Sequence, residues 1–457
     1  MSHQNSPLIL GTERIGKLLK RYAVPAIIAM TASSLYNIAD SIFIGHGVGA
    51  LAIAGLAITF PLMNLAAAFG SLVGVGASTL VAVKLGQREY EGANNALGNV
   101  LTLNITIGIL FTCICLLFLN PILYFFGAGE NTLSYAHDYM EIILIGNVVT
   151  HTYLGLNAVL RSSGHPRMAM YATLASVVIN CVLNPIFIFG FGWGIKGSAW
   201  ATVISQVISL AWQILHFTDP KQLLHFKKGI YRLRAEFVKS MLSIGLSPFL
   251  MNLCSCLIVL LINLGLKKYG GDMAIGAYGI VNRVVFLFVM IVMGLNQGMQ
   301  PIAGYNFGAR RFDRVIKVTK LTIYWAVGVS LFGFLVCHLL PSYIIRMFTT
   351  DAELIRVATD GLHIVFVVFP VVGFQMVATN FFLSIGMSKQ AIFLSLTRQL
   401  LFLIPCLITL PYFFGIWGVW SSLPLSDLLA SILTAFMLAR QFRKFAFSHT
   451  LLSEPNK

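Results

Sequence analysis

Apolar residues form long, continuous runs along almost the whole chain, and short polar segments separate them. Twelve such runs occupy residues 18–42, 53–81, 96–120, 138–160, 169–191, 197–217, 240–265, 274–302, 318–341, 360–385, 391–413 and 417–439. Each run is about as long as the roughly 20 residues that a membrane-spanning helix needs. The runs are too long, and alternate too little, to be barrel strands. The pattern predicts an all-α membrane protein with twelve transmembrane helices.

Composition supports a membrane protein. The 457 residues are 57% hydrophobic and 10% charged, with a mean hydropathy of +0.83. Soluble domains carry about 25% charged residues, so this chain lacks the charge to cover a water-facing surface. Residues 1–16 are polar, and the first apolar run contains Pro25 and continues too far for a cleavable signal peptide.

The net charge of +15 is distributed unevenly between the loops. With the N-terminus in the cytoplasm, 24 of the 31 Lys and Arg residues fall on the inner side and five on the outer side. The remaining two, Arg283 and Arg398, lie within predicted spans. This bias follows the positive-inside rule. It predicts a multi-pass plasma (bacterial inner) membrane protein with both termini cytoplasmic, in contact with lipid headgroups rather than nucleic acid.

A polar linker at 216–237 divides the chain into two halves, 1–220 and 221–457, with six predicted helices in each. An ungapped comparison of the halves at an offset of 222 gives seven identities: Ala52, Ile53, Ile58, Leu65, Gly76, Gly86 and Arg88 recur as Ala274, Ile275, Ile280, Leu287, Gly298, Gly308 and Arg310. Repeats of six helices have the same orientation in the membrane, as in parallel-repeat transporters. We therefore expect two pseudo-symmetric six-helix bundles and transport by alternating access. The alternative is a duplicated scaffold without a transport role.

The first predicted helix carries a polar face inside the membrane. Ser33, Tyr36, Asn37 and Asp40 follow the i, i+3, i+4, i+7 spacing that places side chains on one side of a helix. A carboxylate among hydroxyl and amide groups suits Na⁺ binding or protonation. Pro25, 15 residues upstream, would permit a bend. The alternative is an aspartate at the outer end of the helix that faces the headgroups.

Further polar residues would complete a lining of the first bundle. Asn180 and Asn184 are four residues apart on the fifth predicted helix, next to Pro185. Asn157 on the fourth helix, and Thr202 and Gln206 on the sixth, are candidates for the same lining. Amides also serve as plain interhelical hydrogen bonds, so this structural role stays open.

The second half carries charges of its own within the predicted spans. Arg283 and Gln297 lie on the eighth helix, Arg398 on the eleventh and Asp427 on the twelfth. Asp427 is the clear candidate partner for Arg398, either as a structural ion pair or as a substrate or gate contact. Arg283 either contacts substrate or extends to the membrane interface.

The chain contains no Walker lysine loop, no H-E-x-x-H motif and no G-x-S-x-G elbow. We therefore expect no enzymatic activity, no organic cofactor and no direct use of ATP. An intramembrane enzyme would need converging acids or a metal set, and Asp40 and Asp427 lie in opposite halves.

Four stretches carry a family resemblance: "ADSIFIGHGVGALAIAGLAITFP", "SLVGVGASTLVAVKLGQ", "QGMQPIAGYNFGA" and "RSSGHPRMAMYATLASVVINCVLNPIFIFGFGWGIKGSAWATVISQ". Together with the two halves, they resemble the multidrug and toxic compound extrusion (MATE) family, bacterial type, over essentially the entire chain. The resemblance implies efflux of organic cations or drugs by antiport with H⁺ or Na⁺, by a monomer in the lipid bilayer.

The resemblance also implies a cation site in the first bundle. This site maps onto a set of polar positions, with Tyr36 nearby: Asp40, Asn157, Asn180, Asn184 and Thr202. One position departs from the family pattern, because related bacterial members commonly have an acid at the position of Asn184. Asp40 would then be the sole formal charge, so a Na⁺ site at Asp40 and a proton site both stay open. A flippase for a lipid-linked precursor, from the same wider superfamily, is the alternative function.

Overall fold

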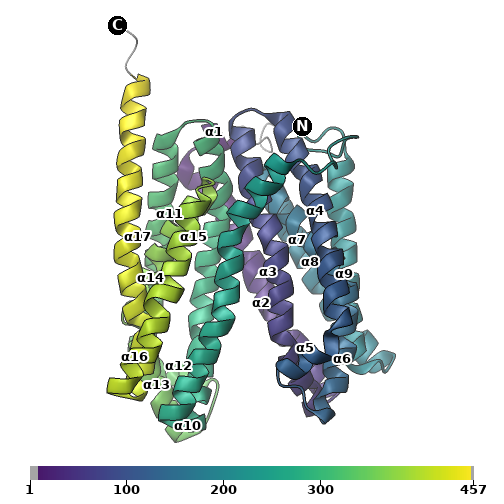
Figure 1. Cartoon of the computed structure of the whole chain (residues 1–457), viewed down its shortest axis with the longest axis vertical. Coiled ribbons are helices and arrows are strands. Elements are labelled where there is room, and N and C mark those ends of the chain that lie inside the picture. The colour runs from purple at the N-terminus through teal and green to yellow at the C-terminus, as the bar shows by residue number, and fades with distance from the viewer. Residues whose placement is uncertain (1–8, 454–457) are drawn as a thin grey trace. The chain divides into compact units, whose positions relative to one another are not determined.

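The computed structural model describes residues 9–453, apart from the side chains of Asn37, Ala50, Asp272 and residues 448–453. The prediction for Asn37 therefore concerns a side chain that lies outside the described residues. Over this range the protein is helical and contains no strand. The helices (Figure 1) are α1 (Ile9–Thr12), α2 (Ile15–Gly47), α3 (Ala50–Gly86), α4 (Tyr90–Leu117), α5 (Leu119–Phe125), α6 (Glu130–Ile145), α7 (Asn147–Ser162), α8 (Pro166–Pro185), η2 (Ile186–Gly190), α9 (Gly194–Thr218), α10 (Ala235–Gly308), α11 (Phe312–Leu339), α12 (Pro341–Arg346), α13 (Ala352–Phe366), α14 (Phe369–Ser384), α15 (Ser388–Leu396), η3 (Thr397–Leu403), α16 (Ile404–Phe414) and α17 (Ile416–Ser453). The segments η2 and η3 are π-helical, and α10 is two helices joined at Gly271, whose φ is 69°.

The predicted spans match the observed helices. Within the described range, ten helices are long and apolar enough to cross a membrane, and two bent pairs raise the number to twelve. The pair α6–α7 bends by 53° at Gly146, and the pair α13–α14 bends by 51° just before Phe369 and Pro370. Proline disfavours helical geometry in the residue that precedes it, which explains the second break. The expected all-α fold with twelve transmembrane helices is confirmed.

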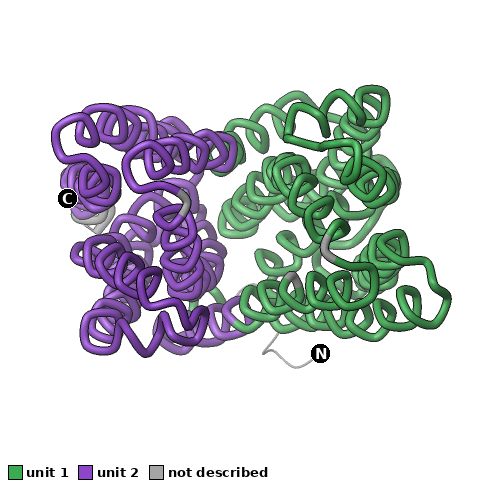
Figure 2. Tube along the Cα trace, turned by 90° about the horizontal axis from the view of Figure 1, so that it is seen from below, with its two compact units in different colours: residues 1–12, 28–249 green, residues 13–27, 250–457 purple. Residues whose placement is uncertain are grey.

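The chain packs into two compact units (Figure 2). Unit 1 contains residues up to 12 and residues 28–249, and unit 2 contains residues 13–27 and the chain from 250 onward. The boundary expected from the repeat lies between residues 220 and 221. Packing instead assigns the first half of α2 to unit 2 and the first 15 residues of α10 to unit 1.

Glycines of the repeat hold these two helix ends. A Cβ at Gly76 would lie 2.0 Å from the carbonyl oxygen of Met241, at the start of α10 in unit 1. A Cβ at the equivalent Gly298 would lie 2.6 Å from the Cα of Ala23, at the start of α2 in unit 2. Small residues let membrane helices approach this closely. The identity of Gly76 and Gly298 therefore has a packing reason in each unit.

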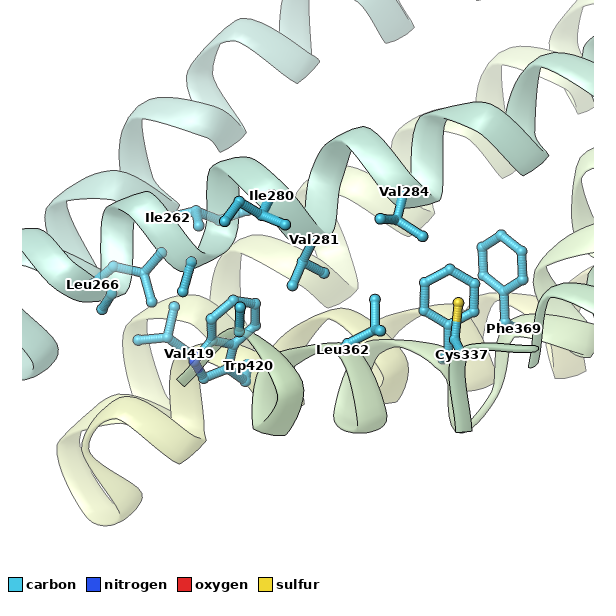
Figure 3. Close-up of a cluster of buried hydrophobic side chains, with 14 of the residues drawn as sticks. Ile262, Leu266, Ile280, Val281, Val284, Cys337, Leu362, Phe369, Val419 and Trp420 are labelled. Atoms are coloured by element: carbon cyan, nitrogen blue, oxygen red, sulfur yellow. The ribbon is translucent and has the colours of Figure 1, made fainter. Parts of the chain in front are cut away.

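Each unit has its own apolar core. In unit 2, Leu362 of α13 and Val419 and Trp420 of α17 are 3% exposed or less and belong to one cluster (Figure 3). A Cβ at Gly361 would lie 2.6 Å from the Trp420 ring, so this glycine provides the space for the indole. In unit 1, a second cluster joins Ile44 of α2 to Tyr139 of α6.

The linker after α9 is held on α4 through its backbone. The Nδ2 atom of Asn99 donates to the carbonyl oxygens of Ile230 and Arg232, both at 3.2 Å, and its Oδ1 accepts from the backbone N–H of Arg234 at 2.9 Å. A Cβ at Gly98 would lie 2.3 Å from the Ile230 carbonyl oxygen. Because these bonds use backbone atoms of the linker, they place no restriction on its basic side chains.

Two repeat-related arginines share an unusual backbone conformation. Arg88 and Arg310 have φ values of 62° and 55°, and they are the non-glycine residues with positive φ in the described range. This left-handed conformation costs about 1–2 kcal/mol per residue for a side chain with a Cβ. Both arginines follow a spanning helix by two residues, after Gly86 and Gly308. The same turn therefore recurs in both halves.

His165, between α7 and α8, predicts a pH dependence of stability. Burial and the neighbouring His216, whose ring centre is 4.7 Å away, lower the pKa of His165 to about 4. The folded protein keeps this ring neutral, whereas the unfolded chain protonates it below about pH 6.5. The stabilisation is therefore complete above pH 6.5 and declines toward pH 4.

We expect the wild type to lose roughly 3 kcal/mol more stability than His165→Gln between pH 7 and pH 4. Thermal unfolding of the purified protein in detergent, followed across this pH range, measures the difference. Parallel losses in the two proteins would contradict the assignment.

Candidate functional site

Asp40 lies in unit 1, inside the protein and away from the surface. Its side chain is 5% exposed, on the part of α2 that packs with α8 and α9. The Nδ2 atom of Asn184 donates a hydrogen bond of 3.0 Å to Asp40 Oδ1, and the Ser198 hydroxyl donates to the same oxygen. The interpretation of Asp40 as a headgroup-facing residue at the outer end of its helix is therefore wrong.

A chain of hydrogen bonds continues from Asn184 away from the carboxylate. Asn184 Nδ2 also donates to Asn180 Oδ1 at 2.7 Å. Asn180 Nδ2 in turn donates to Thr202 Oγ1 at 3.1 Å, and the Tyr36 hydroxyl is 2.8 Å from that same oxygen. The network thus begins and ends on α2.

The spacing of these residues explains why they meet. Three helices each contribute two residues at i and i+4, one turn apart on one face: Tyr36 and Asp40 on α2, Asn180 and Asn184 on α8, and Ser198 and Thr202 on α9. Two stacked pairs from each helix give two layers of polar groups. One layer contains the carboxylate and the other contains the threonine hydroxyl.

Local backbone geometry brings α9 close enough for the Ser198 contact. Pro185 ends α8, and the chain continues as the π-helical segment η2. A Cβ at Gly197 would lie 2.9 Å from the carbonyl carbon of Phe187 in η2. Any larger residue at position 197 would push α9 away from η2. Gly197 therefore positions the neighbouring Ser198.

The electrostatics of the site are dominated by a single carboxylate. None of the ion pairs formed by the described residues includes Asp40. The Oδ1 atom of Asn184 is buried and lacks a hydrogen-bond partner within the described structure. A buried charge without a counter-ion is costly, so binding a proton or a small cation there lowers the free energy of the site. In the described residues no group of three or more His, Cys, Asp or Glu side chains gathers as a metal site.

The structure does not bring all of the predicted residues into this network. Asn157 Nδ2 donates to the Ala169 carbonyl at 2.9 Å, and its Oδ1 accepts from Arg161, so Asn157 belongs to a second polar cluster. Gln206 accepts a hydrogen bond from Thr150, one turn beyond Thr202 on α9.

Pro25 belongs to the segment of α2 that packs in unit 2. Its place in unit 2 separates it from the hydrogen bonds of Asp40.

In unit 2 the predicted charges are arranged as a pair and a surface group. Arg398 Nε donates to Asp427 Oδ1 at 2.7 Å, with 29% and 13% of their side chains exposed, so these residues form the expected ion pair. Arg283 is exposed, and Gln297 is half-buried on α10. The exposed position of Arg283 agrees with a side chain that extends to the membrane interface.

Sequence reasoning missed two members of the site, Ser198 and Tyr139. Ser198 precedes Thr202 by four residues, so helical spacing gave a usable signal for it. Tyr139 of α6 is 1% exposed and hydrogen-bonds to Thr202. It had no signal of this kind, because its distance from Asp40 depends on how α6 packs against α9.

Two six-helix repeats with a buried carboxylate network define a multi-pass membrane transporter. The family model MatE matches residues 25–186 and 247–408 of the chain, two ranges displaced by 222 residues, the offset of the internal repeat. The matched ranges cover more than half of the chain, so the protein belongs to the MATE family of multidrug efflux transporters. The resemblance seen in the sequence motifs is confirmed.

Individual relatives agree with this assignment. The multidrug export protein MepA of Staphylococcus haemolyticus is 28% identical over 426 residues, which cover 93% of each chain. The structure of the MATE multidrug transporter DinF-BH in complex with rhodamine 6G is 35% identical, with a TM-score of 0.88 over 96% of this chain and 98% of the other. A MATE structure in a bent conformation has a TM-score of 0.92 at 22% identity, over 97% and 98% of the two chains, and supports the fold.

Proposed function

We propose that this protein exports organic cations or drugs by antiport with H⁺ or Na⁺, and that Asp40 is the coupling residue. The observation that carries the proposal is the buried Asp40 carboxylate, held by Asn184 and Ser198 without a basic partner in the described structure. Such a group changes the net charge of the site when it binds a proton or a cation. A cationic substrate responds to that change.

The proposed mechanism is competition between two positive ligands. With Asp40 ionised, unit 1 attracts a cationic substrate. Entry of the coupling ion neutralises Asp40, weakens the attraction and releases the substrate to the outer side by alternating access. Linkage requires each ligand to lower the affinity of the other by the same factor.

The hydrogen-bond pattern favours a proton as the coupling ion. Asn184 Nδ2 and the Ser198 hydroxyl both present hydrogen atoms to Asp40 Oδ1, and a metal cation is repelled by such donors. Na⁺ binding would need several oxygen ligands, whereas a proton needs one. The orphaned Asn184 Oδ1 is an oxygen that either ion would satisfy.

The flippase alternative has less support in the side chains. It needs free cations for an anionic headgroup, but Arg398 is paired with Asp427 and Arg283 is exposed. The relatives with printed functions are multidrug transporters.

The test is transport by the purified protein in liposomes, with rhodamine 6G and ethidium as substrates. We expect export when a pH gradient is imposed without Na⁺. Export driven by a Na⁺ gradient alone would identify Na⁺ as the coupling ion. Absence of export under both gradients would contradict the proposed antiport.

A further inference from the structure

The outer face of α17 carries a surface recess that the transport site does not use. Its lining combines two aromatic residues, one small residue and three basic residues: Phe436, Ala439, Arg440, Arg443, Lys444 and Phe447. These positions repeat every three or four residues, so they form one stripe along the helix.

The length of α17 places this recess at the membrane interface. The apolar span Ile416–Phe447 has 32 residues, which is about 48 Å of helix at 1.5 Å per residue. The hydrocarbon core of a bilayer is about 30 Å thick. The last turns of the span therefore reach the headgroup layer, and Figure 1 shows α17 continuing beyond the end of α15 in the same unit.

The opposite face of α17 is fixed by an aromatic cluster. Phe445 is buried and stacks on Phe312 at the start of α11, with ring centres 4.7 Å apart and planes at 14°. Phe442 packs edge-on against Phe381 of α14 at 5.5 Å. Because these contacts set the rotation of the helix about its axis, the basic stripe is held on the outer side.

The three cations are available to a ligand. Arg440, Arg443 and Lys444 are exposed, and no acidic side chain among the described residues pairs with them. Phe436 and Phe447 beside them are 65% and 68% exposed. Three positive charges between two exposed aromatic rings match a ligand that is anionic at one end and apolar at the other.

We propose that this recess is a binding site for an anionic phospholipid. The phosphate of the headgroup lies on Arg440, Arg443 and Lys444, and an acyl chain lies along Phe436. Guanidinium groups bind phosphate through paired hydrogen bonds, which a zwitterionic headgroup with its own cation satisfies less well. The proposal is independent of the transport mechanism.

Native mass spectrometry of the purified protein in detergent, titrated with phosphatidylglycerol, tests the site. We expect the triple variant R440Q/R443Q/K444Q to bind phosphatidylglycerol about a hundredfold more weakly than the wild type. Glutamine is a good helix former, so the exposed helix face should keep its structure. The variant R440K/R443K keeps the charges and should retain most of the binding.

A matched control removes three basic residues from the linker instead. The variant K227Q/K228Q/R232Q has the same net charge as the recess variant and should bind phosphatidylglycerol as the wild type does. Equal losses in both triple variants would show an unspecific charge effect and overturn the proposal. Equal binding of phosphatidylcholine, or competition by inorganic phosphate at the lipid concentration, would overturn it as well, because the first denies charge selectivity and the second denies a role for the acyl chain.

Discussion

Asp40→Asn is expected to abolish most of the ion-driven export. The substitution keeps the shape and hydrogen-bonding capacity of the side chain, and it removes the charge that a proton or cation neutralises. Coupling free energies of 1–3 kcal/mol correspond to about a 5–150-fold change in affinity, and export under a pH gradient should fall within this range. Uptake and release of rhodamine 6G in liposomes, normalised to the amount of reconstituted protein, measures the effect.

A charge exchange provides the control for Asp40. Asn184 donates to Asp40 at 3.0 Å, so the double variant D40N/N184D moves the carboxylate across one hydrogen bond and leaves it in the network. We expect this variant to regain part of the export that D40N loses. If D40N exports like the wild type, Asp40 is not the coupling residue. If D40N/N184D stays as inactive as D40N, the position of the carboxylate matters as much as its presence.

Arg398→Gln is expected to destabilise unit 2 strongly. The substitution leaves Asp427 without its partner at a position where 13% of the carboxylate side chain is exposed. Breaking a buried ion pair costs about 3–5 kcal/mol, and partial exposure of Arg398 lowers our expectation to roughly 2–4 kcal/mol. Thermal unfolding in detergent, with wild type and variant side by side, gives the difference.

The same measurement on R398L/D427L distinguishes a structural pair from a functional one. Replacing both charges by apolar residues removes the unpaired charge, so this double variant should recover most of the stability. Recovered stability together with normal export of rhodamine 6G indicates that the pair is structural. Recovered stability with lost export would assign Arg398 and Asp427 to substrate binding or gating.

Local information in the sequence was sufficient for the helices and for half of each site contact. Hydropathy identified all twelve spans because an isolated span must be apolar along its length whatever it packs against. Helical spacing identified the pairs Tyr36–Asp40 and Asn180–Asn184, because residues four apart share a face in any α-helix. The repeat was visible because glycines such as Gly76 and Gly298 are constrained by close backbone contacts.

Other features depended on neighbours far away in the chain. Spacing alone cannot say which face of α9 meets α2, so Ser198 and Tyr139 entered the site only through packing. The same reason removed Asn157, which the packing of α7 against α8 directs toward Arg161 and the Ala169 carbonyl.

By itself, the sequence determined the twelve helices, the duplication and a lone carboxylate in the membrane. Each follows from composition or from spacing within one helix. The tertiary structure decided the partners of that carboxylate, the exchange of helix ends between the two units and the pairing of Arg398 with Asp427. These depend on the rotation and depth of separate helices. Close contacts at residues such as Gly197 and Gly245 set both, and no local pattern encodes them.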